Sequence, residues 1–297
     1  MLNLHAVRLF AAVVEAGGFS RAARTLHVSQ PAISKAVRTL EARVGLPLLE
    51  RSPRGLRLTE AGEVLYEHAR SIFALERSAE EDLAARAGLQ RGRLNIGAST
   101  TVATYVLPDL LAGLARAHPG VEVRVESANT GEIERRLLGY EVELALVEGP
   151  VSDARIEVKP WRGDEMVVIA AAGHPLSGRS ELSADDLAAD TFLMREAGSG
   201  TRETGEAAMK AAGLVPRRTL EVGGTEAIKQ AVAAGLGVSL VSRAAIGDQL
   251  ALGKLAILPV AELTTKRTFD RIRLRDRRPT PAVLAFDALL EGDRTPG

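Results

Sequence analysis

Four short segments carry the residue types from which small-anion sites are built. They hold hydroxyls and glycines and are predicted to lie between a strand and a helix: Ser99-Thr100-Thr101, Glu148-Gly149-Pro150, Arg195 to Arg202, and Gly223-Gly224-Thr225. Backbone N–H groups at the start of a helix, with nearby hydroxyls, favour negative charge because the helix dipole has its positive end there. Together the segments predict a site for a small anion. For any single serine or threonine, a plain helix cap is the alternative.

A second group of residues, within positions 29–44, has the pattern of a helix that contacts DNA. On a helix of about 100° per residue, one stripe is apolar and consists of Ile33, Val37, Leu40 and Val44. Ser34, Lys35 and Arg38 fall ~90 to 180° round from that stripe, so they form a polar, basic face. Short polar side chains near the start of a recognition helix read base edges, and cations hold phosphates. We therefore expect Gln30, Ser34 and Lys35 to read DNA.

Three short helices are predicted to position this face. Residues 4–15 have an apolar stripe and are followed by two glycines, which end a first helix. Ser20 is placed to cap a second helix that runs to residue 27, and Ser29 to cap a third, with Pro31 tolerated in its first turn. Short helices joined this tightly suit the presentation of a recognition helix.

Two short strands after these helices are predicted to form a wing. Residues 46–49 and 56–58 flank a turn in which Arg51 and Arg54 are placed to contact the DNA backbone or the minor groove. Residues 1–60 also hold 9 Lys and Arg against 4 Asp and Glu, whereas the whole chain has 38 of each. This excess suggests a head that binds a polyanion, with an ordinary solvated basic surface as the alternative.

One long helix is predicted after the wing. Thr59 is placed to cap it, it runs to about residue 87, and Glu76 interrupts its apolar seam. The seam residues recur at helical spacing: Leu65, Ala69, Ile72, Ala79 and Leu83. Because a lone helix of this length exposes such a seam, pairing with a second chain is the favoured interpretation. Packing of the seam against the chain's own body is the alternative.

From residue 93 onward, strand and helix patterns alternate, which predicts two successive α/β lobes, the first with a parallel sheet. The predicted elements include a helix at 103–117 and separate strands at 156–161 and 165–171. Ligands of open α/β sheets bind beyond the carboxyl ends of the strands. The four anion-favouring segments lie at such positions, so we expect them to line an effector cleft.

Residues 3–66 closely resemble the LysR-type transcriptional regulators. The resemblance is carried by the string GGFSRAARTLHVSQPAISKAVRTLEARVGLPLLERSPRGLRLTEAGEVLY. Leu49, where phenylalanine is usual, and Pro53 in the wing turn depart mildly from the family's pattern. The resemblance implies a winged helix-turn-helix that binds double-stranded DNA. The implied contact residues are Ser29, Gln30, Pro31, Ser34, Lys35, Arg38, Arg51 and Arg54.

The resemblance also implies how the chain is divided. Residues 1–58 are expected to form the winged helix-turn-helix domain, and residues 59–88 a coiled-coil linker helix for dimerisation. Residues 92–161 with 267–290 are expected to form lobe I of an α/β effector domain, and residues 162–266 lobe II. The two lobes together resemble the periplasmic binding-protein fold. Homodimers that assemble into homotetramers are implied, and contact with RNA polymerase is compatible with this class.

Four strings in the effector domain look like one branch of the family, the regulators of sulfur assimilation and of carbon fixation. They are ASTTVATYVLP, LVEGP, REAGSGTR and TEAIKQAVAAGLGVSLVSR. This resemblance implies an effector such as sulfite, sulfate or a phosphorylated metabolite, with the sulfite-linked members matching best. The implied effector-site residues are Ser99, Thr100, Thr101, Gly149, Arg195, Ser199, Thr201, Arg202 and Thr225. Arg195 and Arg202 are the candidate counter-charges, and the sequence leaves open which one faces the cleft.

The sequence argues against several other classes of protein. It has no cysteine, which excludes disulfides and thiolate metal sites, and its five histidines have spacings that indicate no metal cluster. The GSGT segment matches neither a nucleophile elbow nor a P-loop, so no catalytic residue, metal or cofactor is expected. No apolar run approaches the ~18 residues of a membrane span, and the first residues indicate an amphipathic helix rather than a signal peptide. We therefore expect a cytoplasmic protein without membrane contact, rather than a solute-binding transport protein.

Two functional interpretations stay open at this point. In the first, the chain is a regulator whose DNA binding responds to a small, anionic effector. In the alternative, it is a ligand-independent DNA-binding repressor with a degenerate sensor domain. A ligand that changes operator binding would separate the two.

Overall fold

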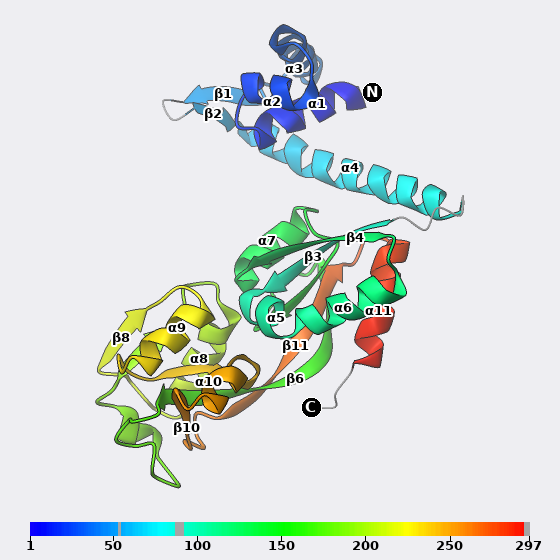
Figure 1. The fold of residues 1–297 in the computed structure, drawn as a ribbon. Coiled ribbons are helices and arrows are strands. Elements are labelled where there is room, and N and C mark those ends of the chain that lie inside the picture. Colours follow the sequence, from blue (N-terminus) through cyan, green and yellow to red (C-terminus); the bar gives the residue numbers. More distant parts are fainter. Residues whose placement is uncertain (53–54, 87–91, 294–297) are drawn as a thin grey trace. The chain divides into compact units, whose positions relative to one another are not determined.

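The computed structural model describes residues 1–52, 55–86 and 92–293. The chain forms two compact units, Met1–Glu80 and Glu81–Gly297. Figure 1 shows the first as a helical head with a two-stranded hairpin and the second as a larger α/β body. Each unit has its own hydrophobic core.

The first unit is a winged helix-turn-helix. Its elements are α1 (Leu4–Glu15), α2 (Phe19–Leu26), α3 (Gln30–Val44), β1 (Leu49–Ser52), β2 (Gly55–Leu58) and the larger part of α4 (Glu60–Arg86). β1 and β2 pair antiparallel as a hairpin. Phe10, Ile33 and Leu40 lie at the centre of the core, and none is more than 2% exposed. The predicted cap at Ser20 is wrong, because α2 already begins at Phe19.

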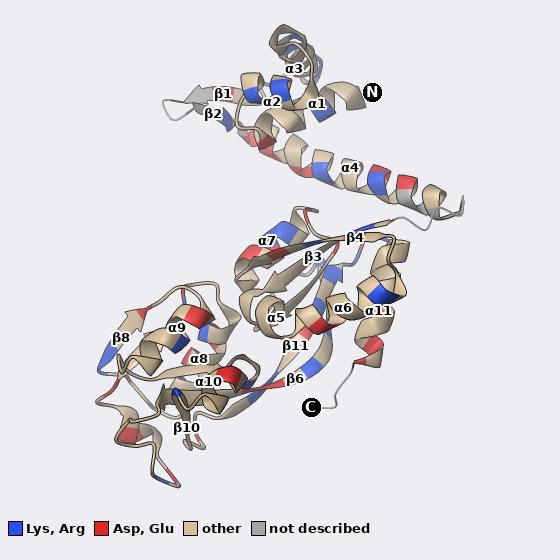
Figure 2. Cartoon of the chain, in the orientation of Figure 1, with Lys and Arg blue, Asp and Glu red and all other residues tan. Residues whose placement is uncertain are grey.

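The long helix α4 is anchored at its start by Thr59. The Thr59 hydroxyl accepts a hydrogen bond from Gly62 N at 3.0 Å and donates one to Pro47 O at 2.6 Å. This side chain therefore caps α4 as predicted and also ties the helix to the segment before the wing. Both acidic and basic residues occur along the helix, coloured red and blue in Figure 2.

The apolar seam of α4 is divided between two environments. Three of its residues pack into the core of the first unit: Leu65, Ala69 and Ile72. Glu76, which interrupts the seam, forms an ion pair with Arg8 of α1. Ala79 and Leu83, further along, are exposed. The first half of the seam is thus covered by the chain's own head, and the second half keeps an exposed apolar face.

The second unit is built on a seven-stranded sheet in the order β10-β6-β11-β5-β3-β4, with β9 also paired to β6. β7 and β8 form a separate two-stranded sheet. The strands are β3 (Gly92–Ser99), β4 (Val121–Ala128), β5 (Leu144–Glu148), β6 (Ile156–Ala171), β7 (Thr191–Met194), β8 (Arg218–Glu221), β9 (Ser239–Ser242), β10 (Leu255–Leu258) and β11 (Thr265–Leu274). The helices are α5 (Thr100–Tyr105), α6 (Leu107–Ala117), α7 (Thr130–Leu138), α8 (Gly200–Ala211), α9 (Thr225–Ala233), α10 (Gly247–Ala251) and α11 (Pro281–Gly292), with the 3₁₀ helices η1 (Ala184–Leu187) and η2 (Arg243–Ala245).

These elements gather into two lobes joined by two long strands. Lobe I holds β3, β4 and β5 with α5, α6, α7 and α11, and lobe II holds β7 to β10 with α8, α9 and α10 (Figure 1). β6 and β11 pair antiparallel and run side by side through both lobes, with one irregularity in register at Phe269 and Asp270. The lobes have separate cores, which lets each pack independently on the shared strands.

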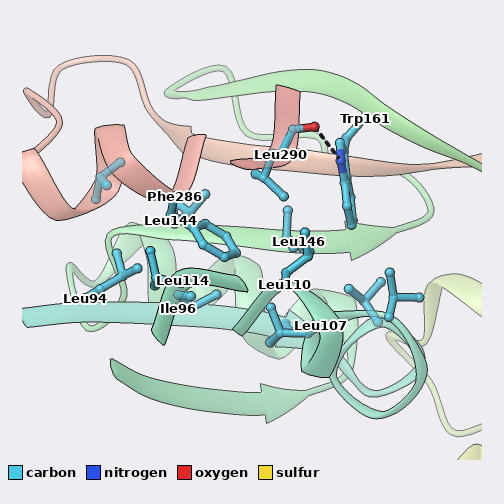
Figure 3. Packing of buried hydrophobic residues seen from close by; sticks show 14 of the residues in the cluster. Leu94, Ile96, Leu107, Leu110, Leu114, Leu144, Leu146, Trp161, Phe286 and Leu290 are labelled. Carbon is cyan, nitrogen blue, oxygen red and sulfur yellow. Dashed lines mark hydrogen bonds between the residues drawn. The ribbon is translucent and has the colours of Figure 1, made fainter. Parts of the chain in front are cut away.

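The core of lobe I lies between α6, α11 and the sheet. Figure 3 shows Leu110, Leu114 and Phe286 packed against strand residues such as Leu146. Trp161 of β6 closes one end of this core, and its indole N–H donates to Leu290 O at 3.1 Å. A buried indole needs such a partner, so the bond fixes α11 on the strands that link the lobes.

The structure corrects two details predicted from the sequence pattern and confirms a third. The helix expected at 103–117 is two helices, because Pro108 starts a new one and lies in the first turn of α6. The two strands expected at 156–161 and 165–171 are one strand, β6. The parallel sheet of lobe I is confirmed for β3, β4 and β5, whereas β9 and β10 of lobe II run antiparallel to β6.

Candidate DNA interface and effector cleft

The residues predicted to read DNA gather at the start of α3 and on its exposed face. Ser29 is the N-cap, and its hydroxyl accepts a hydrogen bond from Ala32 N at 3.4 Å. Gln30, Pro31 and Lys35 are exposed. Their side chains are free to enter a groove while the opposite face of the helix is buried.

The remaining residues of the recognition helix follow the predicted division of faces. Ser34 and Arg38 share the polar face, where Arg38 Nη2 donates to Ser34 Oγ at 3.0 Å. The apolar stripe is buried at Ile33, Val37 and Leu40 and is exposed only at its end, Val44. Arg51 belongs to β1, but its side chain and the whole of Arg54 lie outside the described residues.

Lys35→Ala is expected to weaken DNA binding about three- to tenfold, to a similar extent for different operator sequences. It should also reduce the slope of log K against log salt concentration by about one released ion. The reason is that Lys35 is an exposed cation on the polar face of α3. Fluorescence anisotropy at several salt concentrations would measure both effects. Arg43→Ala, an exposed cation near the other end of α3, is the matched control. Equal loss in both variants would show that net charge alone, and not this face, carries the binding.

Lobes I and II touch where glycine backbones meet. Gly149, with φ of +89°, follows β5, and a Cβ added to it would lie 2.5 Å from Gly200 Cα. A Cβ added to Gly200 would lie 1.7 Å from Glu148 O. Beside this contact, Gly131 N donates to Gly198 O at 3.1 Å. Only glycine permits such an approach, which places the start of α8 directly against the end of β5.

A buried carboxylate lies at this junction. Glu148, the last residue of β5, is 2% exposed. The Ser99 hydroxyl, from the end of β3, donates to one carboxylate oxygen. Thr201 Oγ1, from the start of α8 in lobe II, donates to the other at 3.2 Å. A chain of hydrogen bonds therefore runs from lobe I to lobe II through Glu148.

Arg267 of β11 extends this chain of hydrogen bonds. Its Nη1 donates to Thr201 Oγ1 at 3.3 Å, and its Nε donates to Asp164 Oδ2 at 2.7 Å. The side chains of Arg267 and Asp164 are only 6% and 2% exposed. Ser242 of lobe II donates to the second Asp164 oxygen at 2.7 Å. Sequence reasoning missed Arg267, because the register that places it opposite Asp164 joins residues far apart in the chain.

Two polar atoms among these residues are buried without a hydrogen-bond partner in the part of the chain that the structure describes. They are Thr101 Oγ1 and Arg267 Nη2. Thr101 is 1% exposed and follows Ser99 closely at the start of α5. Because buried polar groups are normally satisfied by protein, water or ligand, each atom has the capacity for one more hydrogen bond.

Other predicted hydroxyls already have partners within their own lobe. Thr100 Oγ1 donates to Ala128 O at 3.2 Å, across the ends of β3 and β4. Ser199 is the N-cap of α8 and accepts from Arg202 N at 3.4 Å. For Ser199 the helix-cap alternative therefore describes the observed contact.

The two predicted counter-charges are both paired with acids of lobe II. Arg195, 3% exposed, donates through Nε and Nη2 to Glu196, each at 2.8 Å, and through Nη1 to Thr225 Oγ1 at 2.7 Å. Arg202 pairs with Glu221 at 2.8 Å. Which of them faces a ligand stays a prediction; the cation that bonds to Thr201 is Arg267 of β11.

Charged groups also set the electrostatics at the edges of the cleft. Burial raises the pKa of the Glu196 carboxyl, but the hydrogen bonds and charge of Arg195 outweigh it and lower that pKa to about 2. A second contact between the lobes is made by Tyr105 of lobe I, whose hydroxyl donates a hydrogen bond to the Glu226 carboxylate of lobe II at 2.8 Å. Burial and this carboxylate raise the pKa of Tyr105, so the phenol stays a donor at neutral pH. The ammonium of Lys229 lies 4.6 Å from the Tyr105 ring centroid.

Within the described ranges, no cluster of three or more His, Asp and Glu side chains is arranged to ligate a metal ion. The same ranges contain no helix with the length and apolarity needed to cross a membrane.

A winged helix-turn-helix and a two-lobed α/β body with a polar junction between its lobes define a DNA-binding regulator with a sensor domain. Residues 4–63 match the family described as bacterial regulatory helix-turn-helix protein, lysR family, and residues 87–293 match the LysR substrate binding domain. The chain belongs to the LysR family of transcriptional regulators. The resemblance seen in the sequence is thereby confirmed, and the matched relatives are regulators rather than enzymes.

Three similar proteins bear on the branch within the family. The HTH-type transcriptional regulator CysL of Bacillus subtilis is 34% identical over 90% of this chain and 89% of its own length. The RuBisCO operon transcriptional regulator of Allochromatium vinosum is 36% identical over 96% of this chain and 94% of its own. The regulatory domain of Synechocystis PCC6803 CcmR, solved in complex with 2-PG, is 32% identical, with a TM-score of 0.64 over 68% of this chain and 97% of that domain.

Proposed function

We propose that this LysR-family regulator binds a promoter dyad as a dimer or tetramer and changes conformation when a small anion binds between its lobes. The observation that carries the proposal is the chain of hydrogen bonds through Ser99, Glu148, Thr201 and Arg267, which spans both lobes. A ligand that enters this chain contacts both lobes at once, so it has different affinities for their closed and open arrangements. The cytoplasm, where the promoter DNA lies, is the site of action.

An oxyanion is the effector class that the donors favour. Thr101 Oγ1 and Arg267 Nη2 are buried and unpartnered among the described residues, and both are hydrogen-bond donors. The similarity to CysL and to a RuBisCO operon regulator, and the 2-PG complex of CcmR, are the comparisons that support our choice of sulfite, sulfate or a phosphorylated metabolite. Of the residues predicted for this site, we retain Ser99, Thr101, Gly149 and Thr201 as the lining, with Arg267 added. We assign Thr100, Arg195, Ser199, Arg202 and Thr225 a supporting role.

The response passes from the cleft to DNA through the spacing of two heads. β6 and β11 link the lobes, so closure on an anion rotates one lobe against the other about these strands. In a dimer held partly by the exposed second half of the α4 seam, that rotation changes the distance between recognition helices and the bend of the DNA. The change in geometry, with or without contact to RNA polymerase, sets activation or repression.

Thr201→Ala is expected to lower anion affinity about 10- to 100-fold while operator affinity in the absence of effector stays unchanged. Thr201 is the only lobe II hydroxyl that we find, within the described residues, bonded to Glu148. Calorimetry with sulfite, sulfate and 2-PG on the full chain, alongside operator binding, measures both properties. Thr204→Ala on the same helix is the matched control, since its hydroxyl only donates to Gly200 O at 2.8 Å. Wild-type protein that binds none of these anions would exclude the oxyanion assignment.

A further inference from the structure

Lobe II contains a buried lysine that the proposed anion site does not use. Lys229 of α9 is 2% exposed, and its ammonium donates to Ala245 O at 2.6 Å and to Gln249 Oε1 at 3.2 Å. It also forms an ion pair with Glu226 Oε2 at 2.8 Å. These partners all belong to lobe II, and they occupy every N–H that an ammonium offers. Lobe II therefore holds the charge of Lys229 in place without help from lobe I.

Tyr105, the last residue of α5 in lobe I, contacts both members of this ion pair. Its hydroxyl donates at 2.8 Å to Glu226 Oε2, the same oxygen that meets Lys229. Its ring centroid lies 4.6 Å from Lys229 Nζ, within the range of a cation–π contact. Lys229 also lowers the pKa of the Glu226 carboxyl, which keeps this acceptor ionised at neutral pH. One side chain of lobe I thus makes a charge-assisted hydrogen bond and a cation–π contact with lobe II.

The half of the contact that lobe II supplies does not depend on Tyr105. Gln230 and Gln249 donate to the other Glu226 oxygen, each at 3.2 Å, so lobe II keeps the carboxylate in place when Tyr105 withdraws. The Glu226 side chain is 56% exposed, so water can replace the phenol once the lobes part. Separation of the lobes therefore costs the two contacts of Tyr105, and closure restores both at once.

We propose that Tyr105, Glu226 and Lys229 form a latch that stabilises the closed arrangement of lobes I and II in the absence of any effector. The latch joins α5 to α9, whereas the glycine contact joins the end of β5 to α8. Because its contacts exist only in the closed arrangement, the latch raises the fraction of chains that are closed before a ligand arrives. The consequence for sensing rests on the proposed function: an anion that binds the closed lobes gains affinity in proportion to that fraction.

The distance between the lobes in the full chain tests the latch without any ligand. The sequence has no cysteine, so Arg116→Cys on α6 and Leu252→Cys after α10, both at exposed positions, give one labelled pair across the lobes. Pulsed electron spin resonance on the nitroxide-labelled chain, diluted with unlabelled chain so that pairs within one chain dominate, measures the closed and open populations. Tyr105→Leu should lower the closed-to-open ratio about 10- to 100-fold, and Tyr105→Phe, which keeps the ring, about three- to tenfold.

Tyr140 supplies the matched control because its contacts have the same chemistry within a single lobe. Its hydroxyl donates to Asp276 Oδ2 at 3.2 Å, and the Arg277 guanidinium carbon lies 6.0 Å from its ring centroid. All three residues belong to lobe I, so Tyr140→Phe should leave the closed-to-open ratio unchanged.

The outcomes separate the latch from the anion sensor. A labelled parent chain that is fully open, or a Tyr105→Leu ratio equal to that of the parent, overturns the latch and leaves the anion sensor standing. If the ratio falls as expected, calorimetry with sulfite and 2-PG should show an affinity that falls by the same factor as the closed fraction. A shifted ratio in a protein that binds neither anion overturns the anion sensor and supports the latch. If Tyr105→Leu does not fold, as judged by circular dichroism, the comparison of Tyr105→Phe with the parent decides.

Discussion

Gly200→Ala is expected to hold the lobes apart and to lower effector affinity roughly 10- to 100-fold, while the first unit continues to bind DNA. The added Cβ would lie 1.7 Å from Glu148 O and 2.6 Å from its carbonyl carbon. Both are backbone atoms, so no side-chain rotation can relieve the overlap, and α8 must retreat from β5. Because Thr201 is the next residue, its hydrogen bond to Glu148 is lost with the retreat.

A neighbouring glycine supplies the control for this prediction. A Cβ added to Gly205, on the same helix, would meet Leu240 Cβ at 3.7 Å, which is ordinary contact. Gly205→Ala should therefore bind effector normally and should gain up to about 1 kcal/mol of stability from helix propensity. Calorimetry for the anion and anisotropy for the operator would measure both variants. Normal effector affinity in Gly200→Ala would show that the closed contact of the lobes is not the state that binds ligand.

Asp164→Ala is expected to reduce the free energy of unfolding of the second unit by about 3 to 5 kcal/mol. The change leaves the Arg267 guanidinium, whose side chain is 6% exposed, without its carboxylate partner at 2.7 Å. A buried charge without a partner is costly, whereas the pair itself contributes little net stability. Urea unfolding followed by circular dichroism would measure the loss.

The next residue in the chain gives a matched comparison. Glu165 pairs with Arg243 at 3.1 Å, but the two side chains are 35% and 59% exposed, so solvent screens the pair. Glu165→Ala should cost less than about 1 kcal/mol. The double variant Asp164→Ala with Arg267→Met should recover most of the stability, because it removes the unpaired charge along with its partner. Equal losses in Asp164→Ala and Glu165→Ala would contradict the assignment of a buried, strongly coupled pair.

The DNA-binding head was predictable because its determinants are local. The apolar stripe of α3, its Ser29 cap and the polar face at Ser34 and Lys35 all lie within about four turns of helix, where spacing alone assigns faces. The same reasoning failed for the second helix, whose start at Phe19 has no side-chain cap to mark it. Local patterns thus located elements well and their first residues less well.

The effector cleft was predictable only in part, because its decisive contacts are not local. The end of β3, which supplies Ser99, and the turn into α8, which supplies Thr201, follow from the rule for open sheets. The pairing of Arg267 with Asp164 depends on the register of β11 on β6, which no short stretch of sequence encodes. The sequence also left open whether Arg195 or Arg202 faces the cleft, and the structure pairs them with the carboxylates of Glu196 and Glu221.

The central position of β11 has a consequence for shortened forms of this protein. β11 lies between β6 and β5 in the sheet, yet it follows both of them in the sequence. A chain that ended before residue 265 would expose the hydrogen-bonding edges of both neighbours, and open strand edges recruit other chains into aggregates. A nonsense mutation before residue 265 would therefore leave neither lobe intact. Such alleles should behave as loss of the whole sensor, with the DNA-binding head attached to an insoluble remainder.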